Sequence, residues 1–151
     1  MARVTPHNET PKFEILEHPA DVGFFAYGAT LEELFANAAL AMISIGGDAE
    51  RVREQERREI DVRGEDAEQL LYAWLAEILA VTDAERLAVR RAEVTELVTR
   101  PGEGRVCGVV FGEAYDRARH QSGVSIKAVT YHQFAIDRTE AGWRARVYLD
   151  L

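Results

Sequence analysis

The apolar residues after Thr30 follow the period of an α-helix. They recur at intervals of three and four positions and therefore fall on one helical face: Leu31, Leu34, Phe35, Ala38, Ala39, Met42 and Ile43. Thr30 and Glu33 have the spacing of a capping box, in which side chains satisfy the open backbone donors of a helix start. Because Gly46 and Gly47 interrupt the stripe, the sequence predicts a helix between Thr30 and these glycines.

A second capping pair predicts a second helix. Asp66 and Gln69 repeat the same spacing. An apolar stripe of helical period follows them: Leu71, Trp74, Leu75, Ile78 and Leu79. Residues 48–58, which lie between the two helical segments, interleave arginine with glutamate. That pattern is typical of a solvated loop or a sheet edge.

Much of the remaining chain has the period of two that is typical of strands. The predicted strands cover residues 13–18, 24–27, 59–63, 87–98, 105–112, 124–137 and 143–149. Residues 1–12 are polar and contain two prolines, so we expect a flexible leader there. Since the strands do not alternate regularly with the helices, the order predicts one α+β domain over residues 13–151, with a mostly antiparallel sheet covered by the helices.

The charge of the chain limits the partners it can bind directly. Its 151 residues carry 18 Lys and Arg against 26 Asp and Glu, a formal net charge of −8. Surfaces that bind nucleic acid normally carry an excess of positive charge, because their affinity comes largely from neutralised phosphates. We therefore expect no strong direct binding to nucleic acid, and we expect cations or basic protein surfaces as partners.

Cysteine content and hydropathy narrow the class further. Cys107 is the only cysteine, which excludes an internal disulfide and a cysteine-rich zinc site. Its strand-like flanks predict a buried structural thiol rather than a nucleophile. No segment has the apolar run of a signal peptide or a membrane span, so we expect a cytoplasmic protein with no membrane contact.

The common catalytic signatures are absent from the sequence. The dinucleotide-binding glycine fingerprint, the Walker loop, the H-E-x-x-H zinc pair and the EF-hand calcium loop have no match. Ser44, Ser122 and Ser125 lack the glycine context of a nucleophile elbow. We therefore assign no catalytic residue and no nucleotide cofactor site.

Three sets of polar residues remain, and the first is an early loop. His18 and Asp21 lie three positions apart, with Pro19 between them and Gly23 just after. This arrangement would allow an imidazole and a carboxylate to face one cavity. The alternative is structural, with Asp21 forming a turn and His18 capping a strand.

The second set lies late in the chain and begins at His120. In a strand, Val124, Ile126, Ala128, Thr130 and His132 would share one face, and Lys127, Val129 and Tyr131 the other. Lys12 and Lys127 are the only lysines among 18 basic residues, which favours a site role for Lys127 because a lysine offers a compact charge with a tunable pKa. An exposed strand lysine whose stem covers apolar surface is an equal alternative.

The third set is the carboxyl end of the chain. Asp150 is followed by Leu151, so the side-chain carboxylate of Asp150 and the α-carboxylate of Leu151 are adjacent. Asp21 would add a third carboxylate if the fold brings it near. Such oxygens are suited to Ca²⁺, Mg²⁺ or Mn²⁺, and without a metal the cluster would suffer like-charge repulsion. The alternative is a frayed acidic tail.

Together these sets resemble the archease family in content and order. The matching pieces are His18-Pro-Ala-Asp21-Val-Gly23, Tyr27-Gly-Ala-Thr30-Leu-Glu-Glu-Leu-Phe35 with Asn37-Ala-Ala39, Leu70-Leu-Tyr-Ala-Trp-Leu-Ala-Glu-Ile-Leu79, His120, Ile126-Lys-Ala-Val-Thr-Tyr-His132 and Asp150-Leu151. The resemblance implies an α+β fold in which a strand-helix-strand-strand module is built into a larger antiparallel framework.

The resemblance also implies a function and a partner. Archeases are protein cofactors of RNA ligation in tRNA splicing and RNA repair. They activate the GTP-dependent ligase that joins RNA ends carrying a 3′-phosphate or 2′,3′-cyclic phosphate to 5′-hydroxyl ends, by promoting guanylylation of the ligase and supporting its turnover. This implies a non-catalytic activator rather than an enzyme.

Site residues are implied by matching position. Asp21 and Asp150 correspond to the metal-binding aspartates of the family, and Leu151 corresponds to the terminal residue that adds an oxygen ligand to a divalent ion, Ca²⁺, Mn²⁺ or Mg²⁺. The polar positions that cluster near the metal are matched by His18, His120, Lys127 and His132.

Two other functions remain open from the residues alone. One is a stand-alone metal-assisted phosphoesterase in which His18 or His132 acts as general base. The other is an interaction module that binds no metal.

Overall fold

Two antiparallel sheets lie on opposite sides of a pair of helices. The computed structural model describes residues 10–17, 21–120 and 123–151. Its elements in chain order are β1 (Phe13–Glu17), β2 (Asp21–Gly28), α1 (Leu31–Gly46), the short 3-10 helix η2 (Ala49–Arg51), β3 (Glu56–Arg63), α2 (Ala67–Glu85), β4 (Leu87–Val98), β5 (Arg105–Ala114), β6 (Ala128–Thr139) and β7 (Gly142–Asp150).

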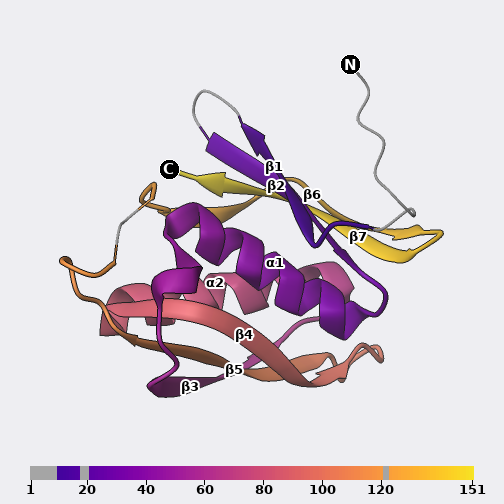
Figure 1. Cartoon of the computed structure of the whole chain (residues 1–151). Helices are drawn as coiled ribbons and strands as arrows, with labels where there is room; N and C mark the ends of the chain where they lie inside the picture. The colour runs from indigo at the N-terminus through magenta and orange to yellow at the C-terminus, as the bar shows by residue number, and fades with distance from the viewer. Residues whose placement is uncertain (1–9, 18–20, 121–122) are drawn as a thin grey trace.

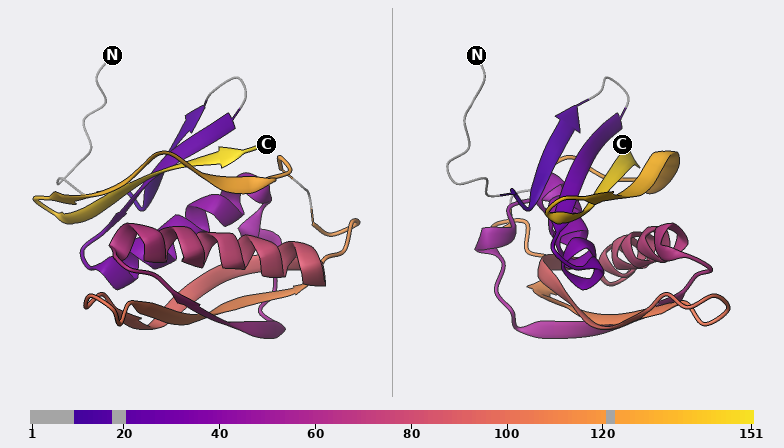
Figure 2. Two further views of the ribbon diagram at one scale, coloured as in Figure 1. Left: turned by 180° about the vertical axis from the view of Figure 1, so that it is seen from behind. Right: turned by 90° about the vertical axis from the view of Figure 1, so that its right-hand side faces the viewer.

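The molecule has three layers, with the two helices between the two sheets. One sheet has the strand order β1-β2-β7-β6 and the other the order β3-β5-β4, and all pairings are antiparallel. Both helices lie between the sheets (Figures 1 and 2), with α1 against β2 and β4 and α2 against β3 and β6. The predicted α+β domain is confirmed, but the helices separate two sheets instead of covering one.

Both helices begin where the capping pairs predict. The Glu33 N–H donates to Thr30 Oγ1 at 3.1 Å, and the Gln69 N–H donates to Asp66 Oδ1 at 2.8 Å. The bond that returns from the Glu33 side chain reaches one residue further back than in an ideal capping box. Glu33 Oε1 accepts from the Ala29 N–H at 2.9 Å. α1 ends at Gly46, as predicted.

The largest buried side chain, Trp74, joins the two helices to the three-stranded sheet. It is fully buried, and its indole N–H donates to the carbonyl oxygen of Phe35 on α1 at 3.0 Å. Its ring also lies against Gly108 of β5, where an added Cβ would come within 2.5 Å of it. Burying an indole with its N–H satisfied is favourable, so this position fixes how α2 packs.

The predictions for the shorter segments have mixed outcomes. The segment 48–58, predicted as a solvated loop or a sheet edge, includes the short helix η2 at residues 49–51, and its last residues belong to the edge strand β3, which begins at Glu56. The strand predicted over 124–137 begins only at Ala128. Ile126 packs against the core rather than sharing the face of Thr130. Cys107 is half-buried on the outer side of β5 rather than fully buried, and burial raises the pKa of its thiol.

Candidate functional site

Asp21 and Asp150 lie directly opposite each other in the β2–β7 ladder. Asp21 begins β2, Asp150 ends β7, and their Cα atoms are register partners. Side chains of directly opposite residues leave the sheet on the same side, with Cβ atoms about 4.5–5.5 Å apart. The expected proximity of Asp21 to the chain's last residues is therefore confirmed by the register, and Figure 1 shows β2 and β7 side by side.

The alternation of the two strands decides which way these carboxylates face. Phe24 and Ala26 of β2 and Val147 and Leu149 of β7 are fully buried toward the helices. The residues between them face outward, since successive side chains in a strand alternate sides. Asp21 and Asp150 are therefore on the outer face of the four-stranded sheet, where Asp150 is exposed and Asp21 is half-buried.

Leu151 anchors the carboxyl end. Its side chain packs against the hydrophobic core, which continues the inward alternation of Val147 and Leu149. This packing fixes the side chain of Leu151 directly after the end of β7.

Lys127 lies at the same end of the sheet. Its backbone N–H donates to the carbonyl oxygen of Asp150 at 2.8 Å, and its side chain is exposed. The preceding segment is held at its other end, because the N–H groups of Gly123 and Val124 donate to the carbonyls of Gly46 and Ile45 at the end of α1. Lys127 is thus positioned by a segment that hydrogen-bonds at both ends.

His132 contacts the ring of Tyr148, which lies on the same face of the sheet as Asp150. Its ring centroid lies 5.4 Å from that of Tyr148, and the Tyr148 ring lies over Gly23 of the adjacent strand, where a Cβ would come within 2.6 Å of it. Only a residue without a side chain leaves room for the ring there. Tyr148 faces outward two residues before Asp150, so His132, Tyr148 and Asp150 occupy one surface.

His120 takes a different position. It is buried, its Nδ1 accepts from the Asp116 N–H at 2.8 Å, and its Nε2 lies 2.9 Å from Glu113 Oε2. The acceptor role of Nδ1 places the proton of the neutral ring on Nε2. These bonds commit both ring nitrogens, and they hold the connector after β5 rather than facing Asp21 or Asp150.

Glu113 is the centre of this buried cluster. Its carboxylate also accepts from Arg119 Nη1 and from the Arg53 N–H, each at 2.9 Å. The Arg119 guanidinium, then the Arg53 N–H and the His120 ring, lower the pKa of the Glu113 carboxyl to about 2. Sequence reasoning missed Glu113, because nothing in the strand pattern predicts an ion cluster at the end of β5.

The remaining predicted site residue, His18, lies outside the described residues. Within the described ranges, no three His, Cys, Asp or Glu side chains are grouped so as to hold a metal ion. Asp21 and Asp150 alone supply two side-chain carboxylates, and the oxygens of Leu151 are the nearest further donors along the chain. This oxygen-only set fits a hard divalent cation such as Ca²⁺, Mn²⁺ or Mg²⁺.

Comparison with known proteins places the chain in a family. The model of the archease protein family (MTH1598/TM1083) matches residues 13–151. The chain is 39% identical over 140 residues to protein archease of Methanosarcina mazei, covering 93% of this chain and 96% of that protein. It is 36% identical over 141 residues to protein archease of Pyrococcus abyssi, covering 93% and 99%.

Solved structures show the same fold. The solution structure of Methanobacterium thermoautotrophicum protein 1598 superposes with a TM-score of 0.79 at 36% identity, covering 93% of this chain and 99% of that one. The crystal structure of an archease from Thermotoga maritima, described as a possible chaperone, matches in fold with a TM-score of 0.59 at 19% identity, covering 97% and 100%. Within the described residues, neither helix has the length and apolar character to cross a bilayer. The family match and these relatives establish that the chain belongs to the archease family.

Proposed function

We propose that this chain binds a divalent cation through Asp21, Asp150 and the oxygens of Leu151, and that in this state it activates a GTP-dependent RNA ligase without catalysing the reaction itself. The archease family is generally known as a group of non-catalytic activators of an RNA ligase. The role in ligase guanylylation and the metal are the finer parts of the proposal. The carrying observation is the direct pairing of Asp21 with Asp150.

Like charges directly opposite each other destabilise an antiparallel sheet. A bound divalent cation would neutralise both carboxylates and join the start of β2 to the end of β7. The three positions provide oxygens only, which favours Ca²⁺, Mn²⁺ or Mg²⁺ over softer metals. The packing of the Leu151 side chain against the core supports this role, because it limits the movement of the residue that follows Asp150.

The surroundings of the pair suit contact with a protein. Lys127 and His132 are exposed polar side chains on the same end of the sheet, where they are available to a docking partner. The net charge of −8 favours approach to a basic surface of the ligase. Binding of RNA is then left to the ligase, because this chain repels phosphates overall.

The test uses the ligase, GTP, Mn²⁺ and an RNA with 3′-phosphate and 5′-hydroxyl ends. Asp21→Ala is expected to lower divalent affinity and the stimulated rate of ligase guanylylation by more than about tenfold, because it removes one of two side-chain ligands. Asp137→Ala is the matched control, since Asp137 is exposed on the same sheet and is paired with Arg144 at 3.4 Å. It is expected to stimulate like the unmodified chain.

Two outcomes would contradict the proposal. A folded Asp21→Ala variant that stimulates the ligase fully would remove the role of the carboxylate pair. Release of phosphate from phosphoesters by the chain alone, lost with the same substitution, would favour the metal-assisted phosphoesterase instead.

A further inference from the structure

The segment 123–127, just before β6, connects the end of α1 to the candidate cation site. The N–H groups of Gly123 and Val124 donate to the last two carbonyl oxygens of α1, at 3.1 Å and 3.3 Å. At the other end of the segment, the Lys127 N–H donates to the Asp150 carbonyl oxygen at 2.8 Å. α1 and β7 finish at the same end of the molecule (Figures 1 and 2), and the segment bridges them.

The bond from Lys127 acts on the peptide group between two of the proposed cation ligands. The carbonyl oxygen of Asp150 belongs to the peptide that links Asp150 to Leu151, and a peptide group is planar. Holding that oxygen therefore sets the plane from which both residues continue. The donor is the backbone of Lys127, whose side chain stays exposed, so this contact does not depend on the lysine charge.

The strand ladders alone give this end of β7 limited support. Asp21 and Asp150 form the last register pair of the β2–β7 ladder. On the other side, β6 pairs with β7 over residues 128–130 and is then interrupted by a bulge at residues 131–134. The short ladder next to Asp150 is thus cut off from the rest of β6, and its position depends on the segment that leads into it.

The segment is also backed by little packing. Gly123, Ser125 and Ile126 form part of the wall of a cavity of about 560 Å³, together with the C-terminal ends of α1 and α2. Ile126 packs against the core, whereas the other side chains of the segment are exposed. Groups that line a void lose the contacts that packing would provide. The hydrogen bonds at the two ends of the segment therefore carry much of its placement.

Gly123 is the residue that lets the segment reach α1. A Cβ at this position would collide with the Ile45 carbonyl oxygen and would lie 3.3 Å from both the Gly46 carbonyl carbon and the Gly47 nitrogen. All three are backbone atoms, which cannot rotate aside as the end of a side chain can. Any side chain at position 123 must therefore separate the segment from the end of α1.

We propose that Gly123 is a positioning residue of the cation site: by letting residues 123–127 dock on α1, it holds the peptide between Asp150 and Leu151 in the orientation that binds the cation. This inference rests on the proposed function, which it deepens by adding a residue that acts through the Lys127 bond. Partners that orient a metal ligand without touching the metal contribute strongly to metal affinity.

The test measures Mn²⁺ affinity by isothermal titration calorimetry of the chain without ligase. Gly123→Ala is expected to raise the Mn²⁺ dissociation constant about tenfold, the effect of losing a partner that orients a ligand. Val124→Pro removes one N–H that donates to α1 and is expected to raise it at least about threefold, the worth of one hydrogen bond. Val124→Ala keeps that N–H at the same exposed position and is expected to stay within about twofold.

A second glycine provides the matched control. A Cβ at Gly104 would collide with the Gly64 carbonyl oxygen beside the start of α2, whereas the cation site lies where the helices end. Gly104→Ala is expected to lower Tm while leaving Mn²⁺ affinity within about twofold, because the strain it introduces is remote from the site. An equal loss of Mn²⁺ affinity in this variant would show a general loosening of the fold and would contradict a positioning role for Gly123.

The remaining outcomes separate this inference from the proposed function. Unchanged Mn²⁺ affinity in folded Gly123→Ala, while Asp21→Ala lowers it, would overturn the inference alone. If Gly123→Ala does not fold, the two Val124 variants decide, and equal affinity of Val124→Pro and Val124→Ala would overturn the inference. Absence of Mn²⁺ binding by the unmodified chain would overturn the proposed cation site and its positioning residue together.

Discussion

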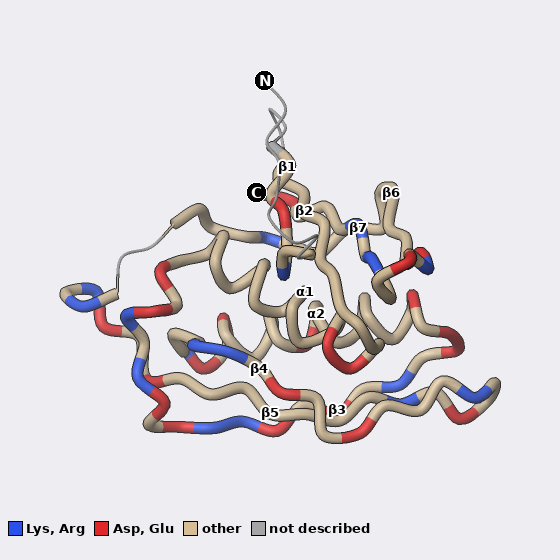
Figure 3. Tube along the Cα trace, turned by 45° about the vertical axis from the view of Figure 1, so that its right-hand side comes forward, with Lys and Arg blue, Asp and Glu red and all other residues tan. Residues whose placement is uncertain are grey.

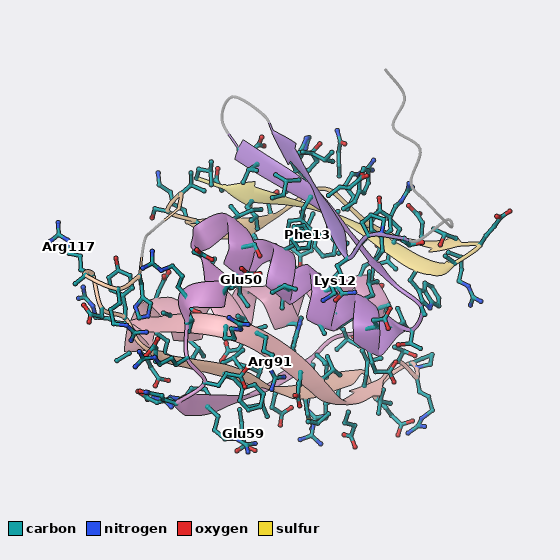
Figure 4. The ribbon with its side chains drawn as sticks, viewed as in Figure 1. Lys12, Phe13, Glu50, Glu59, Arg91 and Arg117 are labelled. Carbon is teal, nitrogen blue, oxygen red and sulfur yellow. The ribbon has the colours of Figure 1, made fainter. Side chains whose placement is uncertain are left out.

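The three-stranded sheet and one end of the four-stranded sheet differ in the arrangement of their surface charges. On the three-stranded sheet, positive and negative residues are interspersed along the strands (Figure 3), and they pair across them: Arg105 of β5 contacts Asp61 of β3 at 2.6 Å and Glu96 of β4 at 3.9 Å. Glu59 of β3 projects away from the helices into solvent (Figure 4). At the end of the four-stranded sheet, Asp21 and Asp150 instead place like charges opposite each other. Exposed ion pairs are a stable and nearly neutral way to cover a sheet, whereas two carboxylates placed directly opposite each other repel.

The largest expected difference between the two surfaces is in their response to a divalent cation. At a free Mn²⁺ concentration 100 times the dissociation constant, binding should stabilise the chain by about 2.7 kcal/mol and raise Tm by roughly 5–10 °C. Asp21→Asn should abolish this rise, because it removes one of the two carboxylate charges that would hold the cation. Calorimetry with and without Mn²⁺ measures both effects.

The matched substitution on the other sheet is Asp61→Asn. It breaks the exposed pair with Arg105 and is expected to change Tm by no more than about 2 °C. The rise with Mn²⁺ should persist. If Asp61→Asn were to abolish it instead, the cation would bind the ion-paired sheet and the contrast between the two surfaces would be wrong.

An effect smaller than the response to the cation, and of a different kind, is expected at His120. His120→Leu leaves the Asp116 N–H and one oxygen of Glu113 without their buried partner, at a cost of about 2 kcal/mol. Chemical denaturation should detect this loss, while Mn²⁺ affinity should stay unchanged because His120 bonds the connector. A large loss of Mn²⁺ affinity in the folded variant would return His120 to the metal site.

The last expected effect is a change in acid sensitivity, which appears only at low pH. The pKa of Glu113 is lowered to about 2 in the folded chain, against about 4.3 for an unfolded glutamate. Its stabilising contribution is therefore complete above about pH 4.3 and is lost as the pH falls toward 2. The difference in Tm between the unmodified chain and Glu113→Gln should shrink over that interval and stay constant from pH 5 to 7. A difference that does not change with pH would show that the Glu113 charge contributes nothing.

Local signals predicted the parts of the fold that local chemistry determines. The helix starts at Thr30 and Asp66 follow from side chains that satisfy neighbouring N–H groups, so a few adjacent residues are enough to find them. The outward direction of Asp150 follows from alternation with Leu149. The division into two sheets does not follow, because it depends on which distant strands pair.

The pairing of Asp21 with Asp150 was predicted because the family resemblance supplied long-range information. Spacing alone left Asp21 and Asp150 undecided, since they are far apart in the sequence and meet only through the β2–β7 register. The bulge at residues 131–134 was missed because a period of two continues through it in the sequence. The stacking of Tyr131 on Tyr72 was also missed, because these two residues belong to different elements that are far apart in the sequence.

The bulge in β6 also limits how other chains can attach. β6 is an edge strand of its sheet, and a regular edge offers a row of open N–H and C=O groups on which a foreign strand can grow. Residues 131–134 interrupt that row, and the Gln133 carbonyl is already occupied by Arg146. Strand addition along the full length of β6 is thereby blocked, which protects this edge from fibril-like polymerisation. A partner that approaches this edge must therefore recognise the shape and chemistry of side chains.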